Sequence, residues 1–263
     1  MNGVAIFGRR MGALIRLSLL ELWRRNDIFV LLVLALVLLV PLSMARPFGV
    51  AGATRYFDEA AFLLIWAFSL FIGLGTGGRL FASEFSNRTI YPLLAKPVSR
   101  GHVLLGKYLG AVIASWSALS FFYILFAISS YFRGGEGVSL CLLQAFVLHA
   151  ACVAVIVAAA VLGSFLVTPA ASATLCAILF PAMFFFGRRL PDYAQNAVEP
   201  TGYLVWLFYW IAPHAEFFDM RQRVVHGWGC VDGLVFLVVL AYAAVYVGLL
   251  LAAARFALNR KSL

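Results

Sequence analysis

The chain has 263 residues, of which 64% are hydrophobic and only 12% are charged. A soluble domain of this length needs far more charged side chains to cover its surface, so the composition excludes that class. A membrane span takes about 20 mostly apolar residues, so about six spans with their loops use the whole chain. The net charge of +9 does not require a nucleic-acid partner, because Lys and Arg gather on cytoplasmic loops and meet anionic lipid headgroups there.

The first predicted element is an amphipathic helix at residues 4–25. Its apolar and small residues fall on one helical face, and arginines flank that face. This pattern is typical of a helix that lies in the membrane interface with its apolar side toward the lipid. The face is formed by Phe7, Met11, Leu14, Ile15, Ser18 and Leu22, and the flanking arginines are Arg9, Arg10, Arg16, Arg24 and Arg25.

Six apolar runs follow, and each is long enough to span a membrane. The first competes with a secretory signal peptide, because Ser43-Met44-Ala45 resembles a cleavage site, but the long amphipathic lead-in favours a span. Thr168-Pro169 separates the fourth run from the fifth. The predicted spans are residues 28–45, 60–78, 108–131, 140–167, an apolar run from there to 186, and 233–254, with an extracytoplasmic loop at 188–232.

The basic residues predict the orientation of the chain. With the N-terminus inside, 13 of the 20 Lys and Arg residues lie on the cytoplasmic side, in the first 25 residues, between the second and third spans, and after the last span. Because basic residues favour the cytoplasmic side, both termini are predicted to be cytoplasmic. The sequence therefore predicts an all-α, polytopic membrane protein with one transmembrane domain over residues 1–263.

The polar residues of the sequence form no recognisable catalytic motif. The sequence has no H-E-x-x-H motif, no paired intramembrane carboxylates and no evident Ser/His/Asp set, so we expect a non-catalytic chain. Four cysteines without a C-x-x-C pair or metal spacing predict neither a disulfide framework nor a zinc site.

His149 lies well inside a span, and we expect a neutral histidine bonded to a neighbouring helix rather than a proton relay. A secondary transporter normally carries charged or broken-helix sites at the midplane of the membrane. The predicted spans of this chain hold almost no charge. Any energy for transport is therefore expected to come from another subunit.

Two glycine motifs resemble nucleotide-binding sequences but lack their context. Residues 101–107 match G-x-x-x-x-G-K, yet Tyr108 follows where a phosphate loop needs Ser or Thr. Residues 73–78 match G-x-G-x-x-G, yet they end a membrane helix rather than a strand. We expect these glycines, including Gly106 and Gly110, to allow close packing of helices.

The most specific part of the chain lies between the second and third spans. Pro92 and Pro97 break any long helix there, and Ser99 is well placed to cap the helix that enters the third span. An apolar cluster lies between charges, as in a docking surface, although an amphipathic loop resting on lipid would look the same. The cluster consists of Ile90, Leu93, Leu94 and Val98.

This segment closely resembles the signature of type-2 ABC exporter permeases. In that family a Glu ends the second span, followed by a Thr-hydrophobic step, a Leu-Leu pair, "Lys-Pro-Val-Ser-Arg" and "Gly-Lys-Tyr". All of these occur here in order, from Glu84 to Tyr108. Many members carry Gly before the Thr, where this chain has Arg88.

The resemblance implies that residues 79–107 form a cytoplasmic coupling segment that contacts a separate ATP-binding subunit. That subunit would bind ATP and magnesium, and this chain would bind no cofactor. A second permease, identical or homologous, would complete the export pathway in a cell membrane, most simply the bacterial inner membrane. The alternative is a secondary transporter or an assembly factor without ATP coupling. The implied contact residues are Glu84, Arg88, Thr89, Leu93, Leu94, Pro97 and Arg100, of which the first three would help form the cytoplasmic end of the bundle.

Residues 213–221 resemble a segment found in one branch of the same family, before the last span. Helical spacing would bring Phe217, Met220 and Val224 together. We expect an interfacial or re-entrant helix at the exit, with an ordinary surface helix as the alternative.

Overall fold

The computed structural model describes residues 2–24, 32–33, 36–37, 53–81, 99–132 and 137–260, and within these ranges it is helical with no strand. Most of the predicted first span, residues 28–45, lies outside the described residues. The principal helices are α1 (Asn2–Arg24), α3 (Ala53–Arg79), α6 (Arg100–Phe132), α7 (Leu140–Leu166), α8 (Pro169–Phe186), α9 (Leu190–Asn196), α10 (Thr201–Ile211), α11 (Arg221–His226) and α12 (Gly233–Arg260), with two 3-10 turns, η1 (Gly187–Arg189) and η2 (Ala215–Phe218).

Five helical stretches of the described chain are long and apolar enough to cross a membrane: α3, α6, α7, α8 continued through α9, and α12. They overlap the second to sixth predicted spans, although the stretch that begins at Pro169 runs to Asn196, past the predicted end at 186 and into the predicted loop at 188–232. The predicted break between the fourth and fifth spans is confirmed, because Thr168 caps α8 through a hydrogen bond from Ala171 N and Pro169 occupies the first turn. Proline suits that position, since the first amide groups of a helix have no partner within it.

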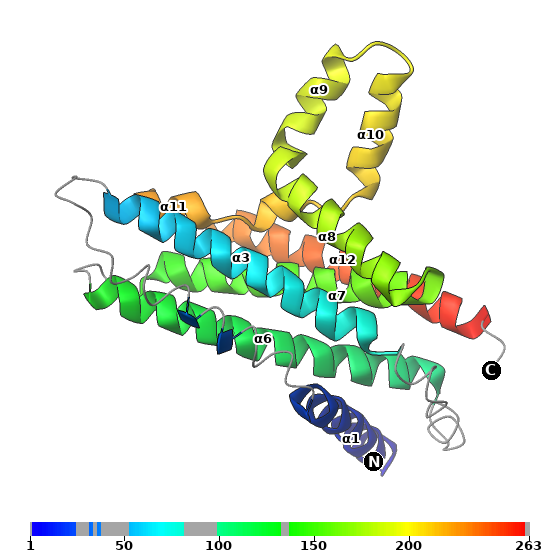
Figure 1. Cartoon of the computed structure of the whole chain (residues 1–263). Coiled ribbons are helices and arrows are strands. Elements are labelled where there is room, and N and C mark those ends of the chain that lie inside the picture. The colour runs from blue at the N-terminus through cyan, green and yellow to red at the C-terminus, as the bar shows by residue number, and fades with distance from the viewer. Residues whose placement is uncertain are drawn as a thin grey trace.

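The bundle is built around α7, which contacts α3, α6, α8 and α12 (Figure 1). The side chains of Val153, Val157 and Val161 in the middle of α7 are fully buried. By contrast, few residues of α12 are buried, and many of its large apolar side chains are exposed. Such a surface needs an apolar environment, either lipid or another protein.

Glycines allow two close helix contacts, as predicted. A Cβ atom added to Gly77 of α3 would lie 2.7 Å from the Val157 carbonyl oxygen of α7. A Cβ atom at Gly110 of α6 would lie 2.6 Å from the Ser18 Cβ of α1. Only glycine lets the backbones approach this closely.

The N-terminal helix packs on the bundle through its predicted apolar face. Leu14 and Ser18 of α1 lie against Gly106 and Gly110 of α6, and Ser18 and Leu22 are buried. Leu17 and Leu20, on the other side of α1, are about half exposed. The apolar face thus meets protein in the structure, and a position of α1 in the membrane interface stays a prediction.

The segment 188–232, predicted as a loop between the fifth and sixth spans, is largely helical. Helices α9 and α10 form a hairpin that stands away from the bundle (Figure 1). The sequence of α10, TGYLVWLFYWI, is almost entirely apolar and aromatic. The polar residues of this segment lie mainly in α9, in α11 and in the connections around α10.

Candidate functional site

The predicted coupling segment, residues 79–107, is described only at its two ends. Six of the seven predicted contact residues lie outside the described part of the chain: Glu84, Arg88, Thr89, Leu93, Leu94 and Pro97. The seventh, Arg100, is the first residue of α6. The structure therefore shows how the bundle holds the ends of this segment. We call this end of the bundle, where α3 and α12 end and α6 begins, the segment end.

The second end of the segment is fixed at the start of α6. Ser99 caps the helix as predicted, since its Oγ accepts a hydrogen bond from the His102 backbone N–H at 3.4 Å and lies 2.6 Å from the His102 Nδ1. Arg100 Nη1 donates to the Leu258 carbonyl oxygen at 3.2 Å. That carbonyl belongs to the last turn of α12, where a cation interacts favourably with the helix dipole. The start of α6 is thereby tied to the end of α12.

Lys107 joins the two ends of the segment to each other. Its side chain is 1% exposed, and its Nζ donates to the Leu80 carbonyl oxygen, just past α3, at 3.3 Å. The same Nζ lies 3.8 Å from Glu21 Oε2 of α1 and 5.5 Å from the centre of the Phe81 ring. A buried ammonium group needs such partners to offset its loss of water.

The contacts of Lys107 explain why the phosphate-loop resemblance misleads. In a phosphate loop the lysine reaches a nucleotide from a turn after a strand. Here Lys107 lies within α6, and the described residues around it are helical. The sequence showed the lysine and its motif, but its bond to residue 80 depends on the approach of α3 to α6. Lys107 with Leu80, Phe81 and Glu21 is called the Lys107 frame below.

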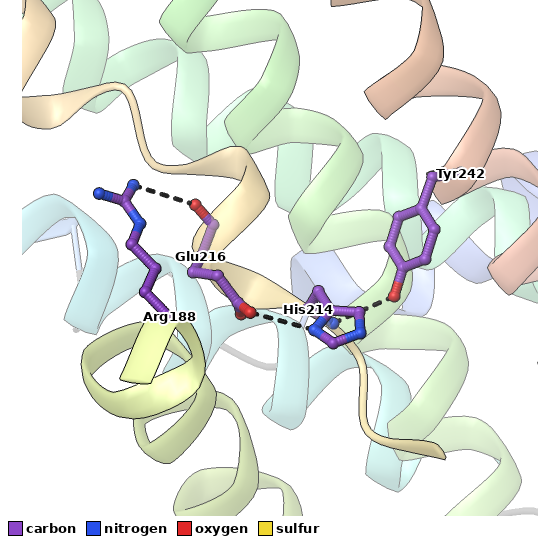
Figure 2. Close-up of polar contacts among 4 residues, drawn as sticks. All are labelled: Arg188, His214, Glu216 and Tyr242. Carbon is purple, nitrogen blue, oxygen red and sulfur yellow. Dashed lines mark hydrogen bonds and ion pairs between the residues drawn. The ribbon is translucent and has the colours of Figure 1, made fainter. Parts of the chain in front are cut away.

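A second polar centre lies toward the opposite end of the bundle, called the loop end, where α6 ends and α7 and α12 begin. Glu216 of η2 is 2% exposed, and its Oε1 lies 3.0 Å from His214 Nδ1 (Figure 2). Arg188 Nη2 donates to the Glu216 carbonyl oxygen at 3.4 Å, and the His214 backbone N–H donates to the Tyr242 hydroxyl at 3.1 Å. These bonds connect η1, η2 and α12.

This centre penetrates the bundle rather than lying on it. Tyr242 lies nine residues past the start of α12, or about 14 Å along the helix at 1.5 Å per residue. A Cβ atom at Gly187 would lie 2.4 Å from the carboxyl carbon of Glu216, so the carboxylate sits directly on the glycine backbone. The pKa of Tyr209 is raised, mainly because the phenol is partly buried and secondly because Glu216 is close to it. The burial of Glu216 does not fit the ordinary surface helix considered as the alternative, and an interfacial or re-entrant position of the segment stays a prediction.

The predicted single helix at 213–221 is wrong in its detail. The chain forms the 3-10 turn η2, breaks at Asp219 and resumes as α11. Asp219 Oδ1 accepts a hydrogen bond from the Arg221 backbone N–H at 2.9 Å, a local bond that competes with helix continuation. As a result Met220 is buried while Phe217 is exposed, so the two residues do not share one face.

His149 is bonded to two neighbouring helices, as predicted. Its Nε2 lies 2.7 Å from Ser69 Oγ of α3, and its Nδ1 lies 3.2 Å from the Tyr123 hydroxyl of α6. The imidazole stacks on Trp66, with 4.4 Å between the ring centres. With both ring nitrogens engaged, His149 acts as a polar link in the core.

The comparison with known families agrees with the resemblance seen in the signature segment. A search of curated proteins found no match. The family model of the ABC-2 family transporter protein matches residues 40–255, which is most of the chain and extends from before α3 into α12, with the signature segment included. The bundle of long apolar helices and this match lead to one conclusion: the chain is a membrane protein of the ABC-2 transporter family and a permease subunit of an ABC transporter.

Proposed function

We propose that this chain couples ATP hydrolysis in a separate ATP-binding subunit to the export of a substrate across the membrane. The coupling segment, residues 79–107, would face the cytoplasm and contact that subunit. ATP and magnesium would bind to the partner, and this chain would contribute no catalytic group. The substrate would pass between this chain and a second permease, which is either an identical copy or a homologue.

The Lys107 frame is the observation that carries the proposal. A segment that transmits force must have ends that move with the helices it drives. Lys107 ties the two ends together through Leu80, and Glu21 adds α1 to the same contact. A displacement of the segment would therefore reach α1, α3 and α6 as a unit.

The last helix would receive the same displacement through Arg100. Its bond to Leu258 connects the start of α6 to α12. Next to it, a Cβ atom at Gly101 would lie 3.4 Å from Arg255 Nε, so α6 and α12 are in close contact here. Because α12 has many exposed apolar side chains, it has a face available for lipid or for the second permease.

The proposed orientation rests on the arginine and lysine bias of the sequence. With the segment end in the cytoplasm, both termini are cytoplasmic and the loop end lies outside. In a bacterium this places the protein in the inner membrane, where an ATP-binding subunit has access to cytoplasmic ATP.

The test is co-purification combined with charge reversal in the segment. The wild-type chain should co-purify with an ATP-binding subunit, and substrate transport should depend on ATP hydrolysis. The Glu84→Arg/Arg88→Glu variant should lose transport while the chain still inserts and folds. Arg100 is kept unchanged because its bond to Leu258 gives it a structural role. The matched control is the Arg189→Glu variant, which should transport normally. Arg189 is an exposed residue of η1, toward the loop end.

Two results would contradict the proposal. One is a purified, active transporter that contains no ATP-binding subunit. The other is a doubly reversed variant that assembles and couples as the wild type does, since the segment would then not be the contact.

A further inference from the structure

Two cysteines that are far apart in the sequence meet at the loop end. Cys141 lies in the first turn of α7, and Cys230 lies in the connection between α11 and α12. The Cys141 thiol donates to the Gly229 carbonyl oxygen at 3.5 Å. Cys230 directly follows Gly229, and both cysteines line the same hollow at this end of the bundle. The two residues are therefore neighbours, although their spacing in the sequence gives no indication of it.

The first two turns of α7 hold the backbone on both sides of Cys230. Gln144, one turn after Cys141, makes two hydrogen bonds with Val231: Nε2 donates to the carbonyl oxygen at 3.1 Å, and Oε1 accepts from the backbone N–H at 2.9 Å. The Cys141 contact holds Gly229 on the other side. Cys230 is thus presented to Cys141 by an ordered backbone.

The rest of the connection is equally well defined. His226 Nε2 lies 3.3 Å from Glu59 Oε1 of α3, which fixes the end of α11. Gly227 ends that helix with a φ of 65°, a conformation that favours glycine. Asp232 Oδ2 then accepts a hydrogen bond from the Leu234 backbone N–H at 3.1 Å at the start of α12. The connection that carries Cys230 is therefore held near both of its ends.

The pair is also accessible. Cys230 is exposed, Cys141 is half-buried, and both line a hollow of about 590 Å³ at this end of the bundle. The two other cysteines, Cys152 and Cys176, are buried within α7 and α8. Only Cys141 and Cys230 combine proximity with access from solution.

We propose that Cys141 and Cys230 form a disulfide bond that ties the start of α7 to the connection before α12. The proposal rests on the proposed function for its orientation, which places the loop end in the extracytoplasmic compartment, where disulfides form and persist. The structure holds both residues as thiols, so the proposal concerns their oxidation after insertion in the membrane.

The oxidant is the disulfide of an extracytoplasmic thiol–disulfide exchange protein. The exposed Cys230, after losing its proton, attacks one sulfur of that disulfide and releases the other as a thiolate. Cys141, after losing its proton, then attacks the Cys230 sulfur of the mixed disulfide and releases the partner's second thiolate. The two cysteines lose two protons and two electrons in total, and the partner's disulfide becomes a dithiol.

The test counts free thiols in the full-length chain. Cells are quenched with acid, and the denatured protein is treated with a maleimide that carries a polyethylene glycol chain, with and without prior reduction. The wild type should gain two adducts without reductant, at Cys152 and Cys176, and four after reduction. Cys141→Ser and Cys230→Ser should each gain three under both conditions, because each leaves one cysteine unpaired.

A separate reading tests the orientation. In the Cys141→Ser variant, an impermeant maleimide should label Cys230 in right-side-out membrane vesicles. Labelling only in inside-out vesicles would contradict the orientation in the proposed function, whatever the adduct count is. Four adducts on the unreduced wild type would overturn the disulfide, whatever the sidedness is. Reductant should also lower the melting temperature of the wild type but not of Cys141→Ser, and an equal response of the two would overturn the disulfide as well.

Discussion

The two ends of this bundle use buried polar residues in different ways. At the segment end, Lys107 joins the points where the chain leaves α3 and enters α6. Toward the loop end, Glu216 and His214 lie in a short turn that penetrates the bundle and contacts η1 and α12. One set of contacts frames a segment that leaves the bundle, and the other anchors a segment that enters it.

This difference indicates which end should control stability and which should control coupling. Glu216 is buried and holds its turn in the bundle through the contact with His214. Its removal should therefore mainly change the free energy of unfolding. Lys107 contacts the two ends of the coupling segment, which transmits movement in the proposed mechanism. Its replacement should therefore mainly change transport. The predictions below test this contrast, starting with the largest expected effect.

Glu216→Ala should lower the free energy of unfolding by about 3 kcal/mol. The change removes a buried carboxylate and leaves His214 Nδ1 without its partner, and such losses are costly in a buried site. Thermal or denaturant unfolding of the purified protein in detergent measures the effect. The control is Glu199→Ala, because Glu199 is exposed and bonds only to Tyr203 in the observed contacts; it should change stability by less than about 0.5 kcal/mol.

Gly187→Ala tests the contact between the Glu216 carboxylate and the backbone of η1. The new Cβ atom would lie 2.4 Å from the Glu216 carboxyl carbon, so the variant should be destabilised. Its cost should shrink when Glu216 is also alanine, with a coupling energy of about 1 kcal/mol or more. Fully additive effects would mean that the carboxylate does not rest on Gly187.

Gly77→Ala should destabilise the bundle by about 1–3 kcal/mol, the usual cost of overpacking. The new methyl group would meet the Val157 backbone carbonyl at 2.7 Å, which cannot turn aside as a side chain could. Gly75→Ala is a close control on the same helix, because no atom lies within 4 Å of its Cβ position. Equal unfolding temperatures for the two variants would show that α3 and α7 are not in contact at Gly77.

Lys107→Met should reduce ATP-dependent transport about tenfold, which corresponds to about 1.4 kcal/mol. Methionine can fill the buried site without a charge, so the fold and the assembly with the ATP-binding subunit should persist. The link from α6 to the Leu80 carbonyl would be lost. Transport by reconstituted vesicles at a fixed rate of ATP hydrolysis measures this loss.

The control for Lys107→Met is Arg189→Met, which removes an exposed positive charge far from the Lys107 frame. Its transport should match that of the wild type. If Lys107→Met instead unfolds the protein and leaves the transport of the folded fraction unchanged, then the contrast between the two ends is wrong.

Ser69→Ala should have the smallest effect, about 0.6 kcal/mol, the average for a hydrogen bond between membrane helices. It removes the 2.7 Å contact with His149 Nε2 but keeps the contact with the Tyr123 hydroxyl. Ser120→Ala is the matched control, since Ser120 bonds only within α6, to the Trp116 carbonyl, in the observed contacts. The difference between these two variants in unfolding experiments isolates the bond between helices, and its absence would contradict the role of His149 as a link.

The sequence predicted the helices well because hydrophobic length and glycine spacing are local properties. The second to sixth spans, the Ser99 cap and the close contacts at Gly77 and Gly110 all follow from nearby residues. The partners of Lys107 and Cys141 depend on the approach of distant helices, which no local pattern encodes. The apolar α10 was missed because the polar residues around it dominated the reading of 188–232.

The site was predicted less completely than the fold. Of the residues expected to contact the ATP-binding subunit, only Arg100 lies in the described part of the chain, and there it bonds to Leu258 within the same chain. A family signature indicates which residues belong to a contact, but it does not separate those that meet the partner from those that hold the segment in place. The other six stay a prediction.

The most direct test of the account is a photo-crosslinking residue placed at Leu94 in the assembled transporter. The account predicts a covalent product with the ATP-binding subunit from Leu94, and none from the same residue placed at Val198, which is 83% exposed at the tip of the α9–α10 hairpin. A product from Val198 and none from Leu94 would contradict the claim that the coupling segment contacts the ATP-binding subunit.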